Sequence, residues 1–450
     1  MKSSDLSVQP KARPPKAAGW PLIGSLRPML TDPLDFFVQS YQQLGPVFRV
    51  QALHRQLTVF AGAEANQFFM REGDALLGSD DLFGGLARET NTTINLAALD
   101  GERHRHWRKI MRPGYSREAF LRNLPQTQET IRATVRSWPL QQPVPVVDAF
   151  RRLITRQLGP AIVQTESGDY FEDIWHFFNT MMQVLVMKTR PRLLLRLPRY
   201  QRAKARSFEF ARQTLDWHKA TPVGERHSDL MDDLMAGQEP DGVQMNDDDL
   251  MAAALGPFFA GLDTVANTCS FMLYSLLADP ALYAQVEAEV DHVLADGAFD
   301  IQQLKQMPTL HGAALETLRR YPVAFSLPRV ALQPFDFGGY HFDTGEIIYV
   351  ATAVTHFLPE FFPDPYTFDA TRHLPPRQEY KQAGKFAPYG LGAHTCLGAG
   401  TAELQIMLTL ALMIHTARLE RTPSDYTLQT IYTPLPCPAA DFRVQVVAYR

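Results

Sequence analysis

The sequence predicts one large, mainly α-helical domain with small β-sheets. Apolar residues recur at helical spacing, with few glycines, through residues 118–217. Residues 246–279 form one apolar segment long enough for about nine helical turns. Length alone would favour two or three domains. No internal repeat or Gly/Ser linker divides the 450 residues, however, and we therefore expect a single domain over residues 15–450.

Composition narrows the class of protein. The net charge of −4 gives no support for nucleic-acid binding, and 45% apolar with 20% charged residues is typical of a soluble globular chain. The three cysteines, Cys269, Cys396 and Cys437, are too few and too widely spaced for a disulfide framework or a paired CxxC zinc site. A reducing cytoplasm is therefore expected.

The N-terminus and the apolar runs contain no targeting or transmembrane signal that we recognise. Residues 1–14 are expected to form an extended, flexible arm because they carry two prolines and no apolar stretch typical of a signal peptide. The longest apolar runs begin at Met251 and Ile406, and both are shorter than the roughly 20 residues that a spanning helix needs.

Several elements can be placed in order along the chain. Residues 48–62 alternate apolar and polar on both sides of His54, Arg55 and Gln56, which predicts a β-hairpin. The long helix should start at Asn246, with acidic residues 247–249 in its first turn, and stop at Asp279 before a proline. Residues 335–354 predict a short β region, and a proline-rich, weakly structured stretch follows them.

The segment YGLGAHTCLG, residues 389–398, gathers glycines around Cys396. A thiolate sulfur is a ligand for soft metal centres, and a single Cys thiolate can hold haem iron. Gly390, Gly392 and Gly398 would allow a tight turn that points backbone N–H groups at the sulfur. The alternative is a buried, inert thiol, which is the usual state of an isolated free cysteine.

This segment resembles the haem-binding loop of the cytochrome P450 family, whose pattern is aromatic, Gly, any, Gly, any, Arg or His, any, Cys, any, Gly. Tyr389 stands where Phe is commoner, and His394 where Arg is commoner. The resemblance implies a haem b cofactor with Cys396 as its iron ligand and with Tyr389 and Gly398 beside it. It also implies that His394 donates a hydrogen bond to a haem propionate.

A second motif, AGLDT at residues 260–264, is similar to the family's oxygen-binding stretch. Ala260 and Gly261 would leave room over the haem. Thr264 would supply a hydrogen-bonding hydroxyl, and Asp263 would deliver protons. Many relatives carry another Thr or Ser at the next position, which here is Val265. Without the resemblance, a plain kinked core helix is the preferred interpretation of this stretch.

A third motif, ETLR, places Glu316 and Arg319 at i, i+3 on one helix face, where they can form a bidentate ion pair. Such pairs are common on surfaces. By resemblance this one is the family's buried ExxR motif, tied to Arg372 in a later stretch whose DATRH departs from the usual pattern. The expected role of all three residues is structural.

Two weaker patches match the family's propionate-binding bases. His104 and Arg108 lie four residues apart in GERHRHWRKIMRP, and Arg329 follows the third motif. Trp107 is out of register, and we assign it to packing. A solvated-surface interpretation of each base stays open.

The resemblance also places the substrate pocket in apolar segments, which favours a lipophilic substrate. The expected wall residues are Leu82, Phe83, Phe258, Phe259, Val323, Ala324, Phe325 and Leu435. Residues 190–206 mix leucines and bases where the family has its mobile lid. Contact of this segment with a membrane surface is an alternative use.

Taken together, the resemblance implies a monomeric, cytoplasmic monooxygenase that inserts one oxygen atom from O₂ into a small lipophilic molecule. Electrons would come from a separate ferredoxin or flavodoxin with its NAD(P)H-dependent reductase. A basic face for that partner would include Arg103, Arg105, Lys109, Arg112 and Lys385, although a solvated charged helix explains the same residues. Two alternatives stay open: a peroxide-driven or electron-free enzyme that rearranges an oxygenated substrate, and a haem-thiolate binding or sensing protein without turnover.

Overall fold

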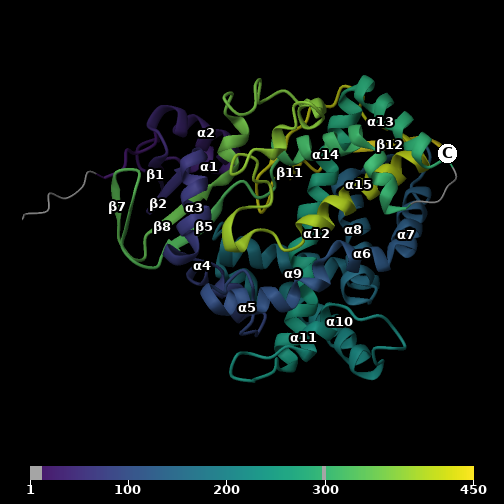
Figure 1. Cartoon of the computed structure of the whole chain (residues 1–450), viewed down its shortest axis with the longest axis horizontal. Coiled ribbons are helices and arrows are strands. Elements are labelled where there is room, and N and C mark those ends of the chain that lie inside the picture. Colours follow the sequence, from purple (N-terminus) through teal and green to yellow (C-terminus); the bar gives the residue numbers. More distant parts are fainter. Residues whose placement is uncertain (1–12, 296–299) are drawn as a thin grey trace, which may run out of the picture.

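The computed structural model describes residues 13–295 and 300–450. Most of the expected N-terminal arm therefore lies outside the described residues. The expected architecture is confirmed: long helices make up most of the chain, and the β-strands gather in small sheets. Figure 1 shows the largest sheet with α1 (Leu26–Thr31), α2 (Pro33–Leu44) and α3 (Gly62–Leu76) at one end of the molecule, and the longer helices across the rest.

The largest sheet has the strand order β1-β2-β8-β5-β3. The predicted hairpin is confirmed, because β1 (Val47–Ala52) pairs antiparallel with β2 (Arg55–Ala61). The parallel neighbour of β2 is β8 (Ile347–Ala351), which also pairs with β5 (Leu327–Ala331). The short β3 (Leu77–Gly78) closes the edge. The rings of Phe60, Phe68 and Phe337 pack on this sheet.

Three smaller sheets complete the β structure of the described residues. The predicted β region contributes the hairpin β6 (Phe335–Phe337) and β7 (Tyr340–Phe342) as well as β8. Near the C-terminus, β10 (Thr430–Ile431) pairs with β11 (Cys437–Pro438). A three-stranded sheet joins β4 (Pro143–Pro145), β12 (Arg443–Tyr449) and β9 (Ala417–Arg421).

The long helix α12 (Asp247–Ala278) has 32 residues and begins and ends where the sequence predicts. The Asn246 side chain accepts a hydrogen bond from Asp249 N at 2.9 Å, and this caps the first turn. Helices α8 (Val146–Val163), α10 (Pro198–Ala220) and α15 (Ala399–Thr416) pack against α12. It therefore runs through the centre of the main hydrophobic core.

The other helices surround this core. They are α4 (Asp80–Glu89), α5 (Gly101–Met111), α6 (Arg117–Arg122), α7 (Leu124–Arg136), α9 (Phe171–Met181), α11 (Leu230–Ala236), α13 (Pro280–Val293) and α14 (Pro308–Arg320). The segment predicted as a lid folds as a short 3₁₀ helix, Arg192–Arg196, followed by the start of α10.

Two helical segments among the described residues, Asp247–Ala278 and Gly392–Thr416, are long and apolar enough to cross a membrane. In each, however, 67% of the most apolar window is buried inside the protein. Burial of this kind is what the core helices of a folded domain show, and it gives these segments little weight as membrane spans.

Candidate active site

A cavity of about 500 Å³ lies between α12 and the glycine-rich loop. Ala260 and Thr264 line it from α12, and Cys396 and Gly398 line it from the loop. Cys396 and Ala260 are exposed to this internal space even though both belong to the middle of the molecule. The second motif and the cysteine loop, 132 residues apart when counted from Thr264 to Cys396, therefore face one cavity.

The loop itself folds as the glycines predict, with one difference. Gly390 and Gly392 have φ of 72° and 70°, in the left-handed region that favours glycine. The Cys396 N–H donates to the Tyr389 carbonyl at 2.8 Å, which closes the turn. Gly398 has an ordinary φ of −90°, so its role differs from that of the other two: its backbone N–H donates toward the Cys396 sulfur.

The electrostatic surroundings of Cys396 act in opposite directions. Burial raises the pKa of its thiol, whereas the Gly398 N–H and the Arg108 guanidinium favour the thiolate. Arg108 lies on α5, and its Nη2 donates to the Thr395 carbonyl beside the cysteine. A cation is thus built in next to the sulfur.

The bases predicted from the weaker patches converge on one rim of the cavity. The rings of His104 and His394 stack at a centroid distance of 3.9 Å, and both residues line the cavity together with Arg108. Burial, together with the charges of His394 and Arg108, lowers the pKa of His104 to about 4. Among the described residues, His104 Nδ1 and the buried Arg329 Nε have no hydrogen-bond partner.

Asp100, which sequence reasoning missed, organises this rim. Its carboxylate accepts hydrogen bonds from Ser79 N at 2.7 Å and Asp80 N at 3.2 Å, and it lies 3.3 Å from His394 Nε2. Burial would raise the pKa of Asp100, but these hydrogen bonds hold it below its usual value. Burial also lowers the pKa of Arg329 to about 10, an effect that the Asp100 charge opposes.

On the opposite wall, Thr264 and Asp263 point in different directions. The Thr264 hydroxyl donates to the Ala260 carbonyl at 2.8 Å, so it sits over the groove between adjacent turns of α12. Asp263 is buried with 2% of its surface exposed, and its Oδ1 accepts from Arg151 Nε of α8 at 2.6 Å. Sequence reasoning missed Arg151, because nothing in the local sequence of α8 marks it as the partner of Asp263.

The third motif forms a buried ion-pair network. Arg319 donates to Glu316 through Nε and Nη2, both at 2.8 Å, and neither side chain is exposed. Arg372 Nε donates to Glu316 at 3.3 Å, as expected, but His373 Nε2 lies closer, at 3.0 Å. Hydrogen bonds from Arg319 and His373 hold the pKa of Glu316 below its usual value against the effect of burial. The surface-pair alternative is therefore wrong.

This network is connected to the start of the cysteine loop. Arg319 Nη1 donates to the His356 carbonyl at 2.7 Å, and His356 Nε2 accepts from Ala387 N at 2.9 Å. Burial lowers the pKa of His356 to about 3, so the ring is neutral at physiological pH. Neither His356 nor His373 belongs to a motif with recognisable spacing, and sequence reasoning therefore missed both.

Three of the eight predicted pocket residues line the cavity: Phe83, Phe259 and Leu435. Phe258 is wrong. Adjacent helical residues point about 100° apart, and Phe258 packs edge-to-face on Phe210 at 5.3 Å with none of its surface exposed. Leu82 on α4 does not line the cavity, whereas its neighbour Phe83 does.

The prediction that the turn after the third motif forms a pocket wall is also wrong. Phe325 packs instead on Phe37 of α2 and on Tyr432, at centroid distances of 6.2 and 6.3 Å. Val323 and Ala324 lie in the same turn, and neither is among the described residues that line the cavity. Trp107 is fully buried in the core, as expected, and Tyr389 is half-buried and does not line the cavity.

Comparison with known proteins agrees with this geometry. The family model "Cytochrome P450" matches residues 14–437, and the chain belongs to the cytochrome P450 family. It is accordingly a cytochrome P450 monooxygenase, a haem-iron oxidoreductase.

Individual relatives are distant. A sterol 14α-demethylase of Mycolicibacterium vanbaalenii is 25% identical over 414 residues, covering 90% of this chain and 91% of the relative. A cyclooctat-9-en-7-ol 5-monooxygenase of Streptomyces melanosporofaciens is 25% identical over 73% of each chain. The structure of retinoic acid-bound cyanobacterial CYP120A1 superposes with a TM-score of 0.83 at 23% identity, covering 98% of this chain and 100% of that one.

The family implies a haem cofactor, and the residues of the cavity fit one. The cavity presents a thiol on one wall and small residues on the other. Two buried basic nitrogens without partners, His104 Nδ1 and Arg329 Nε, lie at or behind the rim. Anionic propionates would satisfy such groups, since buried polar groups are nearly always hydrogen-bonded.

Proposed function

We propose that the chain inserts one oxygen atom from O₂ into a small lipophilic molecule bound above the haem, with electrons from a separate ferredoxin or flavodoxin. The single observation that carries this is that Cys396, Ala260 and Thr264 share one cavity. The haem, when bound, supplies the oxygen-activating chemistry. Binding the haem, orienting hydrogen bonds and carrying protons are roles of the side chains described above.

Cys396 would hold the haem from one side as its thiolate, favoured by the Gly398 N–H and by Arg108. His104, Arg108, Arg329 and His394 would bind the propionates. Because burial already holds His104 neutral, its ring would act as a hydrogen-bond donor and leave the charge pairing to the arginines.

Thr264 would orient a hydrogen bond on the substrate side. Its hydroxyl now donates to Ala260 O and can rotate toward the cavity without breaking a backbone bond of α12. Asp263 would carry protons from outside the cavity. In the structure it is paired with Arg151, whose side chain is 16% exposed, and so a proton transfer requires Asp263 to leave Arg151 transiently.

The substrate class follows from the lining above the thiol, which is apolar and aromatic: Phe83, Leu86, Ile94, Phe178, Met181, Phe259 and Leu435. The names of two relatives refer to a sterol and to a cyclic alkenol. We therefore infer that bulky, largely apolar ring compounds are the first candidates to screen, by the spectral shift that substrates cause in the haem.

The partner surface is the basic side of α5. Arg103 and Arg105 are already paired, with Glu239 and Asp74, whereas Lys109 and Arg112 are exposed and have no ion pair among the described residues. An acidic redox protein would find its uncompensated positive charge there. We further propose a cytoplasmic, monomeric protein.

Product formation tests the proposal. The purified holoprotein is incubated with a substrate found by spectral screening, NAD(P)H and a surrogate ferredoxin with its reductase, and in parallel with peroxide alone. We expect product with the electron donors and much less with peroxide. Efficient turnover with peroxide alone would favour the peroxide-driven alternative, and spectral binding without any product would favour a binding or sensing protein.

A further inference from the structure

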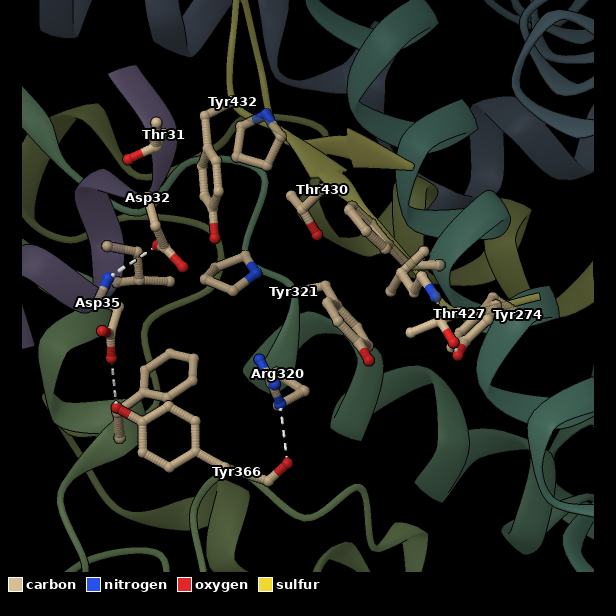
Figure 2. Close-up of a pocket in the computed structure, with 16 residues that line it drawn as sticks. Thr31, Asp32, Asp35, Tyr274, Arg320, Tyr321, Tyr366, Thr427, Thr430 and Tyr432 are labelled. Atoms are coloured by element: carbon tan, nitrogen blue, oxygen red, sulfur yellow. Dashed lines mark hydrogen bonds between the residues drawn. The ribbon is translucent and has the colours of Figure 1, made fainter. Parts of the chain in front are cut away.

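A second cavity of about 550 Å³ lies away from the haem cavity, and the two share no lining residue. It is bounded by α1 and α2, by the end of α14 and by the β10–β11 hairpin (Figure 2). Four tyrosines contribute to its walls: Tyr274, Tyr321, Tyr366 and Tyr432. We call it the tyrosine pocket.

The tyrosine pocket holds a cation without a counter-ion. Arg320 Nε donates to the Tyr366 carbonyl at 3.0 Å, and its guanidinium lies 5.0 Å from the Tyr321 ring centroid and 5.6 Å from that of Tyr366. Within the described part of the chain Arg320 forms no ion pair, although two carboxylates line the same pocket. Its Nη groups are therefore donors available to a ligand (Figure 2).

The two carboxylates are engaged by tyrosines instead. The Tyr366 hydroxyl donates to Asp35 Oδ1 at 2.8 Å, and the Tyr432 hydroxyl donates to Asp32. Asp32 Oδ1 also accepts from Asp35 N at 3.0 Å and Asp35 Oδ2 accepts from Gln39 Nε2 at 2.5 Å, which fixes both acids at the start of α2. A carboxylate has room for about four hydrogen bonds, so both retain acceptor capacity.

This arrangement selects a ligand that donates and accepts at once. A carboxylate would satisfy Arg320 but would meet two acids, and an ammonium would satisfy the acids but would meet Arg320. A neutral hydroxyl can accept from the guanidinium and donate to a carboxylate. The faces of the tyrosine rings offer apolar area to the C–H side of a ring.

We propose that the tyrosine pocket binds a small, neutral, polyhydroxylated molecule such as a sugar or a cyclic polyol. Its hydroxyls accept from Arg320 and donate to Asp32 and Asp35, and its ring lies against tyrosine. This binding site does not depend on the oxygenation chemistry.

The position of the site gives it an effect on the haem cavity. Tyr432 and Pro436 line the tyrosine pocket, and Leu435, between them in the same turn, lines the haem cavity. One five-residue turn is thus a wall of both cavities. A ligand that orders this turn shifts the affinity of the haem cavity, and linkage requires the reverse shift to be equal. This coupling, unlike the binding itself, rests on the proposed function.

Ligand-observed NMR titration of the holoprotein with D-glucose and with myo-inositol tests the binding. We expect saturable binding of at least one probe, weakened about tenfold in Arg320→Gln because a hydrogen bond from a charged donor is lost. Tyr432→Ala, which leaves the charge of the pocket unchanged and removes a ring face, should also weaken binding. Arg55→Gln and Tyr340→Ala, outside the pocket, are the matched controls. Absence of saturation by both probes, or tighter binding of gluconate or of an alkylammonium ion, would overturn the proposal.

A second titration tests the coupling. An azole inhibitor is titrated into the holoprotein by its Soret difference spectrum, with and without the saturating polyol. We expect the polyol to change the azole dissociation constant several-fold, the azole to change polyol affinity by the same factor, and Leu435→Ala to reduce that factor. If azole and polyol both bind independently, the coupling is wrong and the site stands. If the azole gives no Soret response, the proposed function fails while the polyol titration is unaffected.

Discussion

At the scale of single residues, the position of Thr264 has a clear consequence. Thr264→Ala removes the hydroxyl that faces the cavity and should uncouple the enzyme: more NAD(P)H is consumed per product, with little change in substrate affinity. Thr268 is the matched control, because its hydroxyl donates to Thr264 O at 2.8 Å and the residue does not belong to the cavity lining. Product and consumed NAD(P)H are measured together. Equal coupling in Thr264→Ala and Thr268→Ala would contradict the role given to Thr264.

His356 makes stability depend on pH in a defined direction. Its pKa is about 3 in the folded protein against 6.5 for the free side chain, and the unfolded state therefore binds more protons between these values. Stability should then fall as the pH drops below about 6.5. In His356→Gln, whose amide oxygen can accept from Ala387 N, that part of the acid destabilisation should disappear. Thermal unfolding of the wild type and the variant between pH 7 and pH 5 measures this loss of stability.

Exposed His54 supplies the control for this measurement, since His54→Gln should leave the pH slope as it is in the wild type. An unchanged slope in His356→Gln would show that His356 does not carry the effect. The other buried histidines contribute to the wild-type slope, so the comparison is between variants and not with zero.

At the scale of elements, the network that joins α14 to the following loops should be a main source of stability. Glu316→Gln leaves Arg319 and Arg372 without their buried counter-charge, which costs about 3 to 5 kcal/mol of unfolding free energy. Glu118→Gln breaks an i, i+4 pair with Arg122, in which the glutamate side chain is 84% exposed. Its loss should cost less than about 0.5 kcal/mol of unfolding free energy. Denaturant unfolding compares the two. Similar costs for both would mean that the buried network is not stabilising.

The sequence predicted the elements well where local signals are strong. The long helix has its cap at Asn246, its acidic first turn and its terminal Asp279, and all three are local features. The β1–β2 hairpin has the predicted alternation of apolar and polar residues. The β4-β12-β9 sheet joins strands about 300 residues apart in the chain, and no local pattern specifies such a pairing.

In the candidate site, too, the sequence predicted the residues that local motifs mark and missed those that only the tertiary fold brings in. Residues within motifs, such as Cys396 and Thr264, could be named because their spacing is fixed by one loop or one helix. Arg151 and His373 complete the same interactions from other elements, and only the tertiary fold brings them there. The choice between Phe258 and Phe259 depends on the rotation of α12, which periodicity alone does not determine in a helix that is apolar all round.

At the scale of the whole molecule, the charge pattern of α5 predicts how the redox partner docks. The double variant Lys109→Gln/Arg112→Gln removes exposed positive charges and should raise the KM for a surrogate ferredoxin several-fold at low salt, with kcat little changed. The effect should shrink as salt screens the surface. Arg103→Gln, whose charge Glu239 already compensates, should change the KM less.

Steady-state kinetics over a series of ionic strengths provides both numbers. A KM that is the same in wild type and double variant at every salt concentration would place the partner on another face of the molecule.

The central claim is that Cys396 holds a haem as its thiolate ligand inside the cavity beneath α12. The difference spectrum of the reduced, CO-treated holoprotein tests it most directly. We predict the strongly red-shifted Soret band typical of thiolate-ligated haem in the wild type, and its loss in Cys396→Ala, while Cys269→Ala and Cys437→Ala retain it. Absence of that band in the wild type, or its persistence in Cys396→Ala, would contradict the assignment.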